Sequence, residues 1–395
     1  MSIRVLVVDD SAMMRALISR KLNSEPDIEV IAAASDASEA RQLIKQFDPD
    51  VVTLDIEMPG MDGLSFLGKI MSLRPTPVII VSGSTRAGTQ ATARALQLGA
   101  VNCYAKSTRE RSIRDDDGGE LARLVREASK VKMPAPVAPR RPTATVSRRV
   151  QASGTSNHQR SRSGQFATPS SAKLPPARPD VIAIGSSTGG VEALHTLLAE
   201  FPADCPPTMI VQHVNATFAP AIAQSLDKVA RPRVELAQSD DVLKAGHVYL
   251  APGEVKHLEV ATAGSKGLRC VLRAGDLETG HRPSVDRLFA SVAKVVGQNA
   301  IGILLTGMGE DGAKHLRTMA QTGAYTIAQD QASCVVFGMP RAAIALGAAN
   351  AILPLDTIAA GIFSADRSNS GASLPASAHA HSARSNPSAS EGMTR

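Results

Sequence analysis

Two serines lie between two glycines in the stretch Gly185–Gly189 of the sequence IGSSTGG, after an apolar run and before a helical pattern. This stretch fits G-x-S-x-G, a nucleophile elbow in which flanking glycines permit a tight turn that exposes the middle serine. The pattern makes Ser187, rather than Ser186, the candidate nucleophile. It fits neither a dinucleotide fingerprint nor a P-loop, which needs a lysine after the glycine. A glycine-rich connection without chemistry is the alternative that this motif alone leaves open.

A serine nucleophile needs a general base within hydrogen-bonding reach. Of the nine histidines, His213 directly follows the apolar run 209–212, which is the strand expected after the elbow helix. Strands joined by one crossover are usually neighbours, so His213 should lie beside Ser187. We therefore predict that His213 is the base. His281, in the loop ETGHRPSVD, is the second candidate.

A carboxylate that orients the histidine would complete the set. The apolar run 301–305 leads into TGMGEDGAKHL, which offers Glu310 and Asp311 at the start of a helical pattern. We predict Asp311 in this role, with a helix cap as the competing interpretation. The helix after the elbow would offer free backbone N–H groups to developing negative charge.

A second group of reactive side chains lies at the ends of apolar runs in the first 130 residues. Its members are Asp9 and Asp10 in VVDDS, Asp55 in TLDIEMPGMDG, Ser82 in IIVSGS and Lys106 in CYAKS. Three carboxylates in one crevice repel each other unless a hard cation such as Mg²⁺ lies among them. A lysine and a hydroxyl opposite Asp55 would hold an anion there, which predicts phosphoryl transfer onto this aspartate. Helix caps and solvated charges are the alternative for any single member.

The first 130 residues alternate strand-like and helical patterns, which could position this group. The expected strands are 4–8, 29–33, 51–54, 78–81 and 100–104, and the expected helices are 11–23, 37–47, 63–72, 87–98 and 119–130. Five β/α units with short connections predict a doubly wound parallel sheet with helices on both faces. Ligands of such folds bind at the carboxyl ends of the strands, where the acidic group lies.

The block 180–364 also begins with strand, helix and strand. Its expected strands are 181–184, 209–212, 301–305 and 325–328, and its expected helices are 190–199, 217–230, 284–296 and 311–321. Four short runs between turn residues are expected to form antiparallel hairpins, at 233–236, 247–250, 258–261 and 269–272. We therefore predict a mostly parallel α/β sheet with an antiparallel insert.

The chain of 395 residues is too long for one ordinary domain. Residues 131–179 are rich in Pro, Ser and Ala, lack apolar periodicity and contain nine Lys or Arg but no Asp or Glu, which predicts a disordered linker. Residues 365–395 have the same character and predict a disordered tail. We expect one α/β domain at 1–130 and a second at 180–364.

Composition narrows the function classes. The net charge of +6 belongs to the linker, and the rest of the chain carries about −3, which argues against nucleic-acid binding by a folded face. Contact of the linker with acidic lipid or nucleic acid is a minor alternative. No apolar run reaches the roughly 18 residues of a membrane helix, and the start lacks the features of a signal peptide. The cysteines form no C-x-x-C pair, which predicts reduced thiols in a cytoplasm: Cys103, Cys205, Cys270 and Cys334.

Residues 1–125 resemble the receiver domain of two-component response regulators, through VVDDS, DIEMPGMDG, VSGS and AK. The resemblance implies that Asp55 accepts phosphate from a histidine kinase. It also implies a Mg²⁺ site formed by Asp10, Asp55 and the backbone carbonyl of Glu57 with Asp9 in support, and contacts from Ser82 and Lys106 to the phosphoryl group.

Two positions depart from the receiver pattern. Ser107 follows Lys106 where the family usually has proline, and the aromatic residue near the end of the fifth strand is shifted by one, at Cys103 and Tyr104. A shift of one residue turns a strand side chain to the other face of the sheet. Phosphorylation is expected to be retained.

Residues 180–364 resemble the catalytic domain of the chemotaxis protein-glutamate methylesterases. The matching runs are IAIGSSTGG, VQHV, HVYLAPG, HRPSVDRLF, LLTGMGEDGA and TIAQDQASCVVFGMPRAA. The resemblance implies that Ser187 is the nucleophile, His213 the base and Asp311 the residue that orients the base. It further implies oxyanion donors in the backbone N–H groups around Thr188 and Met308. Ser186 stands where the family often has alanine, and we do not expect this to move the nucleophile.

Together the resemblances predict a phosphorylation-activated hydrolase that removes methyl esters from chemoreceptor glutamates, releasing methanol, and deamidates specific receptor glutamines in chemotactic adaptation. Mg²⁺ would serve the receiver only, and ester hydrolysis would need no cofactor. The expected partners are methyl-accepting chemotaxis receptors and a histidine kinase, with no nucleic acid and no membrane insertion. The alternative is a response regulator with a non-catalytic or transcriptional output domain, which the lack of a basic recognition helix in 180–364 disfavours.

Overall fold

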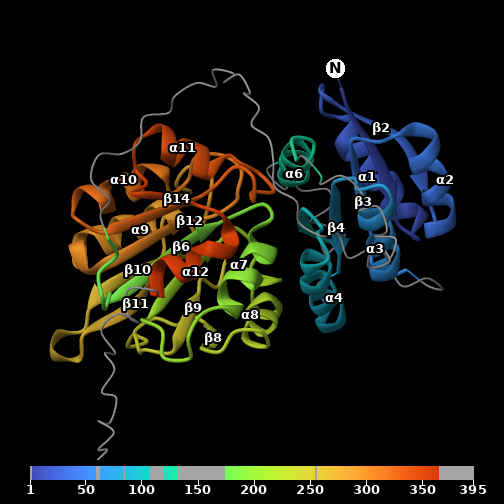
Figure 1. Ribbon diagram of the computed structural model, residues 1–395. Helices are drawn as coiled ribbons and strands as arrows, with labels where there is room; N and C mark the ends of the chain where they lie inside the picture. Colours follow the sequence, from blue (N-terminus) through green and yellow to red (C-terminus); the bar gives the residue numbers. More distant parts are fainter. Residues whose placement is uncertain are drawn as a thin grey trace, which may run out of the picture.

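Two parallel sheets, each covered by helices, make up the structure of the chain (Figure 1). The computed structural model describes residues 2–58, 63–83, 85–106, 119–131, 133, 174–253 and 256–363. Most of the expected linker 131–179, the whole expected tail 365–395 and the departing Ser107 lie outside the described residues.

The first sheet has five parallel strands in the order β2-β1-β3-β4-β5, as predicted. Its strands are β1 (Ile3–Val8), β2 (Ile28–Ala34), β3 (Val51–Leu54), β4 (Val78–Ser82) and β5 (Asn102–Ala105). The helices that accompany them are α1 (Ala12–Asn23), α2 (Ala37–Phe47), α3 (Gly63–Leu73), α4 (Arg86–Gln97) and α6 (Glu120–Ala128). The strands read as continuous apolar runs because helices bury both faces of the sheet.

The second sheet has seven parallel strands in the order β14-β13-β12-β6-β7-β9-β8. Its strands are β6 (Val181–Ser186), β7 (Thr208–Gln212), β8 (Arg233–Leu236), β9 (His247–Leu250), β12 (Ala300–Leu304), β13 (Tyr325–Gln329) and β14 (Ala351–Leu353). The helices are α7 (Gly190–Ala199), α8 (Ala219–Asp227), α9 (Val285–Val295), α10 (Ala313–Gln321), α11 (Met339–Ala345) and α12 (Leu355–Phe363), with short 3₁₀ turns at Gly264–Lys266 and Gly297–Asn299.

The antiparallel insert is smaller than predicted. Among the strands of the described residues, only β10 (His257–Thr262) and β11 (Leu268–Arg273) pair antiparallel, as a separate two-stranded sheet. The runs 233–236 and 247–250, expected in hairpins, are instead parallel strands: β8 forms one edge of the sheet, and β9 lies between β8 and β7. The prediction was wrong there because a four-residue apolar run shows which face is buried but not in which direction the strand runs.

Alternate residues of β6 divide the core of this half into two layers. Ile182 and Ile184 pack in the cluster that includes residues of α7, α8 and α12. Val181 and Ala183 pack in the cluster that includes residues of α9, α10 and α11. The chain leaves β6 toward β7 on one side and later returns with β12 on the other. The carboxyl end of β6 is therefore the switch point at which such sheets bind ligands.

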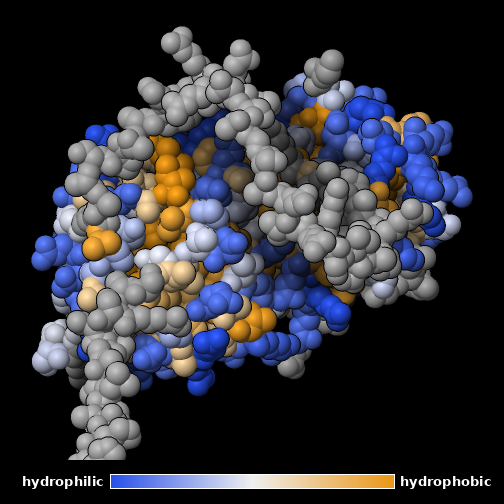
Figure 2. Space-filling model, in the orientation of Figure 1, coloured by the Kyte–Doolittle hydropathy of each residue, from blue (hydrophilic) through white to orange (hydrophobic). Residues whose placement is uncertain are grey.

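On the face shown in Figure 2, hydrophilic residues predominate around α2. Apolar surface is visible around α11 and β14, where Leu346 and Ile352 are exposed (Figure 2). None of the helices within the described residues combines the length and apolar character needed to cross a bilayer.

Candidate active site

The elbow turn lies where β6 ends and α7 begins. Ser187 is only 6% exposed, and the close packing around the turn explains its glycines. A Cβ on Gly185 would come within 2.2 Å of Val285, and one on Gly189, whose φ is +75°, within 2.5 Å of Val335. Any larger residue at these positions would push the turn away from its neighbours.

Strand register brings Ser187 and His213 to the same edge of the sheet. In the parallel pair β6–β7, Ser186 lies opposite Gln212, so that the next residue of each strand is Ser187 and His213. The backbone N–H of His213 donates to the carbonyl of Ser186 at 3.0 Å. The two predicted residues line the same pocket.

The buried amide of Gln212 ties the two strand ends together. Its Oε1 accepts a hydrogen bond from the Ser186 hydroxyl at 2.7 Å. Its Nε2 donates to the carbonyls of Ser187 at 2.8 Å and His213 at 3.1 Å. Ser186 departs from the family pattern, and its hydroxyl is engaged by a residue of the neighbouring strand. This bond argues against Ser186 as the nucleophile.

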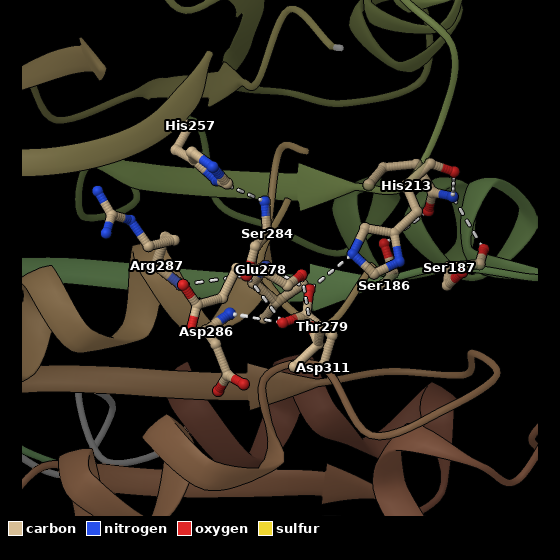
Figure 3. A network of polar contacts seen from close by, with 12 residues as sticks. Ser186, Ser187, His213, His257, Glu278, Thr279, Ser284, Asp286, Arg287 and Asp311 are labelled. Carbon is tan, nitrogen blue, oxygen red and sulfur yellow. Dashed lines mark hydrogen bonds and ion pairs between the residues drawn. The ribbon is translucent and has the colours of Figure 1, made fainter. Parts of the chain in front are cut away.

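His213 and Asp311 form a direct pair. Nε2 of His213 lies 2.8 Å from Oδ2 of Asp311, and Figure 3 shows the imidazole between Asp311 and Ser187. Nδ1 of His213 is buried and bonds no polar atom of the described residues. It is the nitrogen left for a proton from Ser187.

The competing interpretation required Asp311 to cap the helix that follows it, and the structure shows that it does not. Gly312 caps α10, and the Asp311 carboxylate instead accepts bonds at the start of α9. The donors are Ser284 Oγ at 2.8 Å, Val285 N at 2.7 Å and Asp286 N at 3.1 Å (Figure 3). Burial would raise the pKa of Asp311, but the His213 imidazole and these backbone N–H groups outweigh it and lower that pKa. The carboxylate therefore stays ionised and available to orient His213.

His281, the second candidate for the base, stacks on the first. The rings of His213 and His281 are 3.8 Å apart between centroids and 9° from parallel. Burial, and next the charge on His213, lower the pKa of His281 to about 3. A neutral ring thus covers one face of His213, and its pKa suits packing better than proton transfer near neutral pH.

A loop after β12 packs against the other side of Ser187, the candidate nucleophile. The backbone N–H of Ser187 donates to the Thr306 carbonyl at 3.1 Å, and the Thr306 hydroxyl donates to the Thr188 carbonyl at 3.0 Å. A Cβ on Gly307 would lie 2.8 Å from Cβ of Ser187. The segment that carries Met308 therefore lies against the elbow, where the oxyanion donors were expected. Glu310, the other acid of this loop, is exposed.

The remaining described histidines have structural partners. His195 contacts Gln97, His247 pairs with Glu235, and His315 pairs with Asp286. His257 is buried and accepts from the backbone N–H of Ser284 at 3.2 Å, so it supports the turn that bonds Asp311 (Figure 3).

The predicted acidic group of the first sheet comes together. Ligand oxygens of Asp9, Asp10 and Asp55 lie within 4.8 Å of one another, and such an all-oxygen donor set fits Mg²⁺. Oδ1 of Asp55 accepts from the backbone N–H of Glu57 at 2.9 Å, so the Glu57 backbone lies beside this set.

Lys106 neutralises part of this acidic group. Its Nζ lies 2.6 Å from Oδ2 of Asp55 and 2.8 Å from Oδ2 of Asp9. Burial would lower the pKa of Lys106, but the bonds to both carboxylates outweigh it and raise that pKa. Burial raises the pKa of Asp9, against the opposing effect of Lys106. Ser82 is fully buried at the end of β4, and its carbonyl accepts from the backbone N–H of Lys106 at 2.8 Å.

The two residues that depart from the receiver pattern in β5 occupy opposite faces. Cys103 is buried and lines the pocket that also contains Ser187 and His213. Tyr104 packs with the other core cluster of the first sheet, and Lys21 lies over its ring. Burial raises the pKa of the Cys103 thiol, so this pocket wall is neutral.

The two halves of the chain meet around this pocket. Leu96 and Cys103 of the first half face Ser187 and His213 of the second. Nε2 of Gln97, at the end of α4, lies 2.6 Å from Nε2 of His195 and 2.5 Å from Oγ of Ser225. The candidate nucleophile thus faces the receiver-like half.

Sequence reasoning missed the supporting residues Gln212, Ser284 and Thr306. All three are polar and fully or almost fully buried. Gln212 and Thr306 are polar residues at or just beyond the end of an apolar run, and Ser284 precedes a helical pattern as a possible N-cap. Many solvated loop residues share these signals.

Comparison with known proteins gives matches over almost the whole chain. The model of the CheB methylesterase family matches residues 182–362, and that of the response regulator receiver domain matches residues 5–116. A protein-glutamate methylesterase/protein-glutamine glutaminase of Caulobacter vibrioides is 51% identical over 88% of this chain and 93% of its own length. One from Agrobacterium fabrum is 46% identical over 90% of this chain and 94% of its own. The solved CheB catalytic domain of Thermotoga maritima is 33% identical, covers 47% of this chain and 98% of its own, with a TM-score of 0.46.

Proposed function

The chain belongs to the CheB family of protein-glutamate methylesterases/protein-glutamine glutaminases, and on this premise we propose that its Ser187, His213 and Asp311 hydrolyse glutamate γ-methyl esters of chemoreceptors. The observation that carries the proposal is the 2.8 Å contact between His213 and Asp311 at the strand end beside Ser187. It leaves the buried Nδ1 of His213 as the base.

The proposed reaction has two steps. Nδ1 of His213 takes the Ser187 proton while Oγ attacks the ester carbonyl, and methanol leaves with that proton. Water, activated by the same imidazole, then cleaves the acyl-serine and releases the glutamate. Backbone N–H groups of Thr188 and Met308 would stabilise the oxyanion. With a glutamine substrate the same steps release ammonia.

Replacement of the nucleophile tests the assignment. We expect Ser187→Ala to lower methanol release from methylated receptor by about 10⁴-fold or more, while Asp55 still accepts phosphate. Ser186→Ala is the matched control and should retain activity, because Ser186 bonds Gln212 rather than the substrate. Full hydrolysis by Ser187→Ala would refute the nucleophile.

Regulation follows from the acidic group of the first half. We propose that Asp55 is phosphorylated by a histidine kinase and that Asp10, Asp55 and the Glu57 carbonyl hold Mg²⁺, with Asp9 in support. The metal would supply charge neutralisation during phosphoryl transfer. Ser82 and Lys106 would then contact the phosphoryl group, and Lys106 would exchange its bond to Asp55 for one to the phosphate.

The proposal includes the setting of the reaction. The partners are methyl-accepting chemotaxis receptors and a kinase, and the reaction takes place in the cytoplasm. Residues 1–130 form the regulatory domain, 180–364 the catalytic domain, and 131–179 the linker between them, followed by a tail at 365–395. In the unphosphorylated protein the receiver packs over the pocket that contains Ser187 and His213, and this packing inhibits the enzyme. Phosphorylation of Asp55 then separates the receiver from the pocket.

A further inference from the structure

Helix α6 carries a buried glutamate against the candidate active site. Glu127 lies in the last turn of α6 and is 6% exposed. Its Oε2 accepts a hydrogen bond from the hydroxyl of Thr188 at 3.5 Å, and its Oε1 pairs with Arg123, one turn earlier on the helix. Thr188 directly follows the proposed nucleophile, so a carboxylate of the regulatory half bonds the residue next to Ser187.

Apolar contacts surround this glutamate. Leu121, Leu124 and Val125 of α6 belong to a core cluster that also includes Val336, with Met308 and Val335 packed against it. Met308 follows the glycine that touches Ser187, and Val335 packs against Gly189 of the elbow. The rim of the site therefore closes around α6 and excludes water from the Glu127 carboxylate.

The neighbouring residue of α6 faces the opposite way. Arg126 pairs with Glu25 at 2.6 Å and with Asp27 at 2.5 Å, both within the first half of the chain. One side of the helix is thus fastened to its own domain, while the next residue presents a carboxylate to the other domain.

The position of Glu127 matches the chemistry of the product. Ester hydrolysis ends with a free glutamate carboxylate beside the nucleophile, and the expected substrates carry their glutamates on a receptor helix. Glu127 is a glutamate with an unesterified side chain on a helix, and it bonds the residue next to the proposed nucleophile. A carboxylate has no leaving group, so this occupant is not consumed.

We propose that Glu127 occupies the subsite for the substrate's glutamyl side chain, so that α6 closes the enzyme as a product-like segment and marks where a receptor helix docks. This inference rests on the proposed esterase function. The substrate must displace α6, so the closed enzyme should show a raised KM and an unchanged kcat, because only the population of the open state differs.

Two substitutions that keep the approximate size of Glu127 distinguish its hydrogen bond to Thr188 from the effects of apolar packing and of charge. In the full chain without phosphodonor, Glu127→Met keeps the volume but loses the acceptor for Thr188. We expect it to raise kcat/KM for methanol release by about threefold to tenfold, through KM, as the loss of one hydrogen bond predicts. Glu127→Gln keeps an acceptor and should remain at the wild-type value. Exposed Glu29→Ala is the control and should also remain there.

A small fluorophosphonate that labels Ser187 provides a second readout that needs no receptor. Labelling should be faster in Glu127→Met and unchanged in Glu127→Gln. If both variants match the wild type, apolar packing rather than the Glu127 carboxylate closes the site. If both variants are activated, the ion pair with Arg123 closes it. Either result overturns the proposal. If phosphodonor-treated wild type releases no methanol while Ser187 is still labelled, the esterase function itself fails.

Discussion

At the residue scale, the proposed chemistry depends on how Asp311 is held. Three donors at the start of α9 bond its carboxylate, and it is 1% exposed. Its lowered pKa keeps it ionised well into the acid range, so it can balance the charge that His213 would gain in the proposed reaction.

Asp311→Asn should therefore cost activity without a change of size. An asparagine offers a single acceptor oxygen, and its NH₂ group would face backbone N–H donors. We expect kcat for methanol release to fall by about 10³–10⁴-fold in the phosphodonor-activated protein. Glu310→Gln, one residue earlier and exposed, is the matched control and should keep its rate. Equal losses in both variants would contradict the assignment.

The stacked His281 makes stability depend on pH. Its pKa falls from 6.5 to about 3 on folding, so the unfolded chain binds more protons between these values. This contribution to stability is complete above pH 6.5 and is lost as pH falls toward 3.

His281→Phe keeps a flat ring without a titrating group. Melting temperatures measured from pH 8 to pH 4 should fall less steeply for this variant than for the wild type. At pH 8, His281 is neutral in both the folded and the unfolded chain. The difference in melting temperature between variant and wild type at this pH therefore measures packing alone and serves as the control. Parallel curves would show that His281 does not titrate on unfolding.

At the scale of elements, the ends of β6 and β7 act as one unit through Gln212. Gln212→Ala would remove three buried hydrogen bonds and leave the carbonyls of Ser187 and His213 without this donor. We expect a loss of about 2–4 kcal/mol in unfolding free energy, measured by urea denaturation, and a lower kcat. Ser186→Ala loses only one of these bonds and should lose less stability. Wild-type stability in Gln212→Ala would contradict this role.

Sequence patterns predicted most of these elements and their order. The runs 51–54, 233–236 and 247–250 agree with the strands at both ends. Continuous apolar runs between helices identify buried parallel strands because few other structures bury both faces. The direction of β8 and β9 could not be predicted, since it depends on pairing with distant strands. The elements that follow β13, which are α11, β14 and α12, were not predicted from the sequence pattern.

The candidate site was predictable to the extent that strand ends meet. The strands β12, β6 and β7 are adjacent in the sheet. Ser187 directly follows β6, His213 directly follows β7, and Asp311 lies in the loop after β12. The stacking of His281 and the bonds from the start of α9 depend on how a loop folds back across the sheet. No local pattern encodes that path.

At the scale of the whole molecule, the two halves are joined by polar contacts and a shared rim around the nucleophile. Gln97 bonds His195 and Ser225, and Gln90 bonds Gln224 at 3.4 Å. Most of the connecting segment 131–179 lies outside the described residues. The composition of this segment predicts a linker, and a linker of about 49 residues would permit docking without enforcing it.

Phosphorylation should therefore change the rate only through Asp55. In Asp55→Asn the amide cannot accept phosphate, and it loses the charge that pairs with Lys106. We expect methanol release to stay at the basal rate with and without a small-molecule phosphodonor, while the wild type is activated. Activation of Asp55→Asn by the phosphodonor would place the switch elsewhere.

Removal of residues 1–178 asks whether the first half inhibits the second. The deletion takes away α4, α6 and the Cys103 wall of the pocket but leaves the seven-stranded sheet and its own two core layers intact. Since Ser187 then faces solvent, the truncated protein should release methanol faster than the unphosphorylated full chain and should ignore the phosphodonor. Its kcat should equal that of the activated full chain, because the catalytic residues are the same and only their accessibility has changed. A truncated protein that stays folded, as its circular dichroism would show, yet works at the basal rate would mean that the receiver does not inhibit the enzyme.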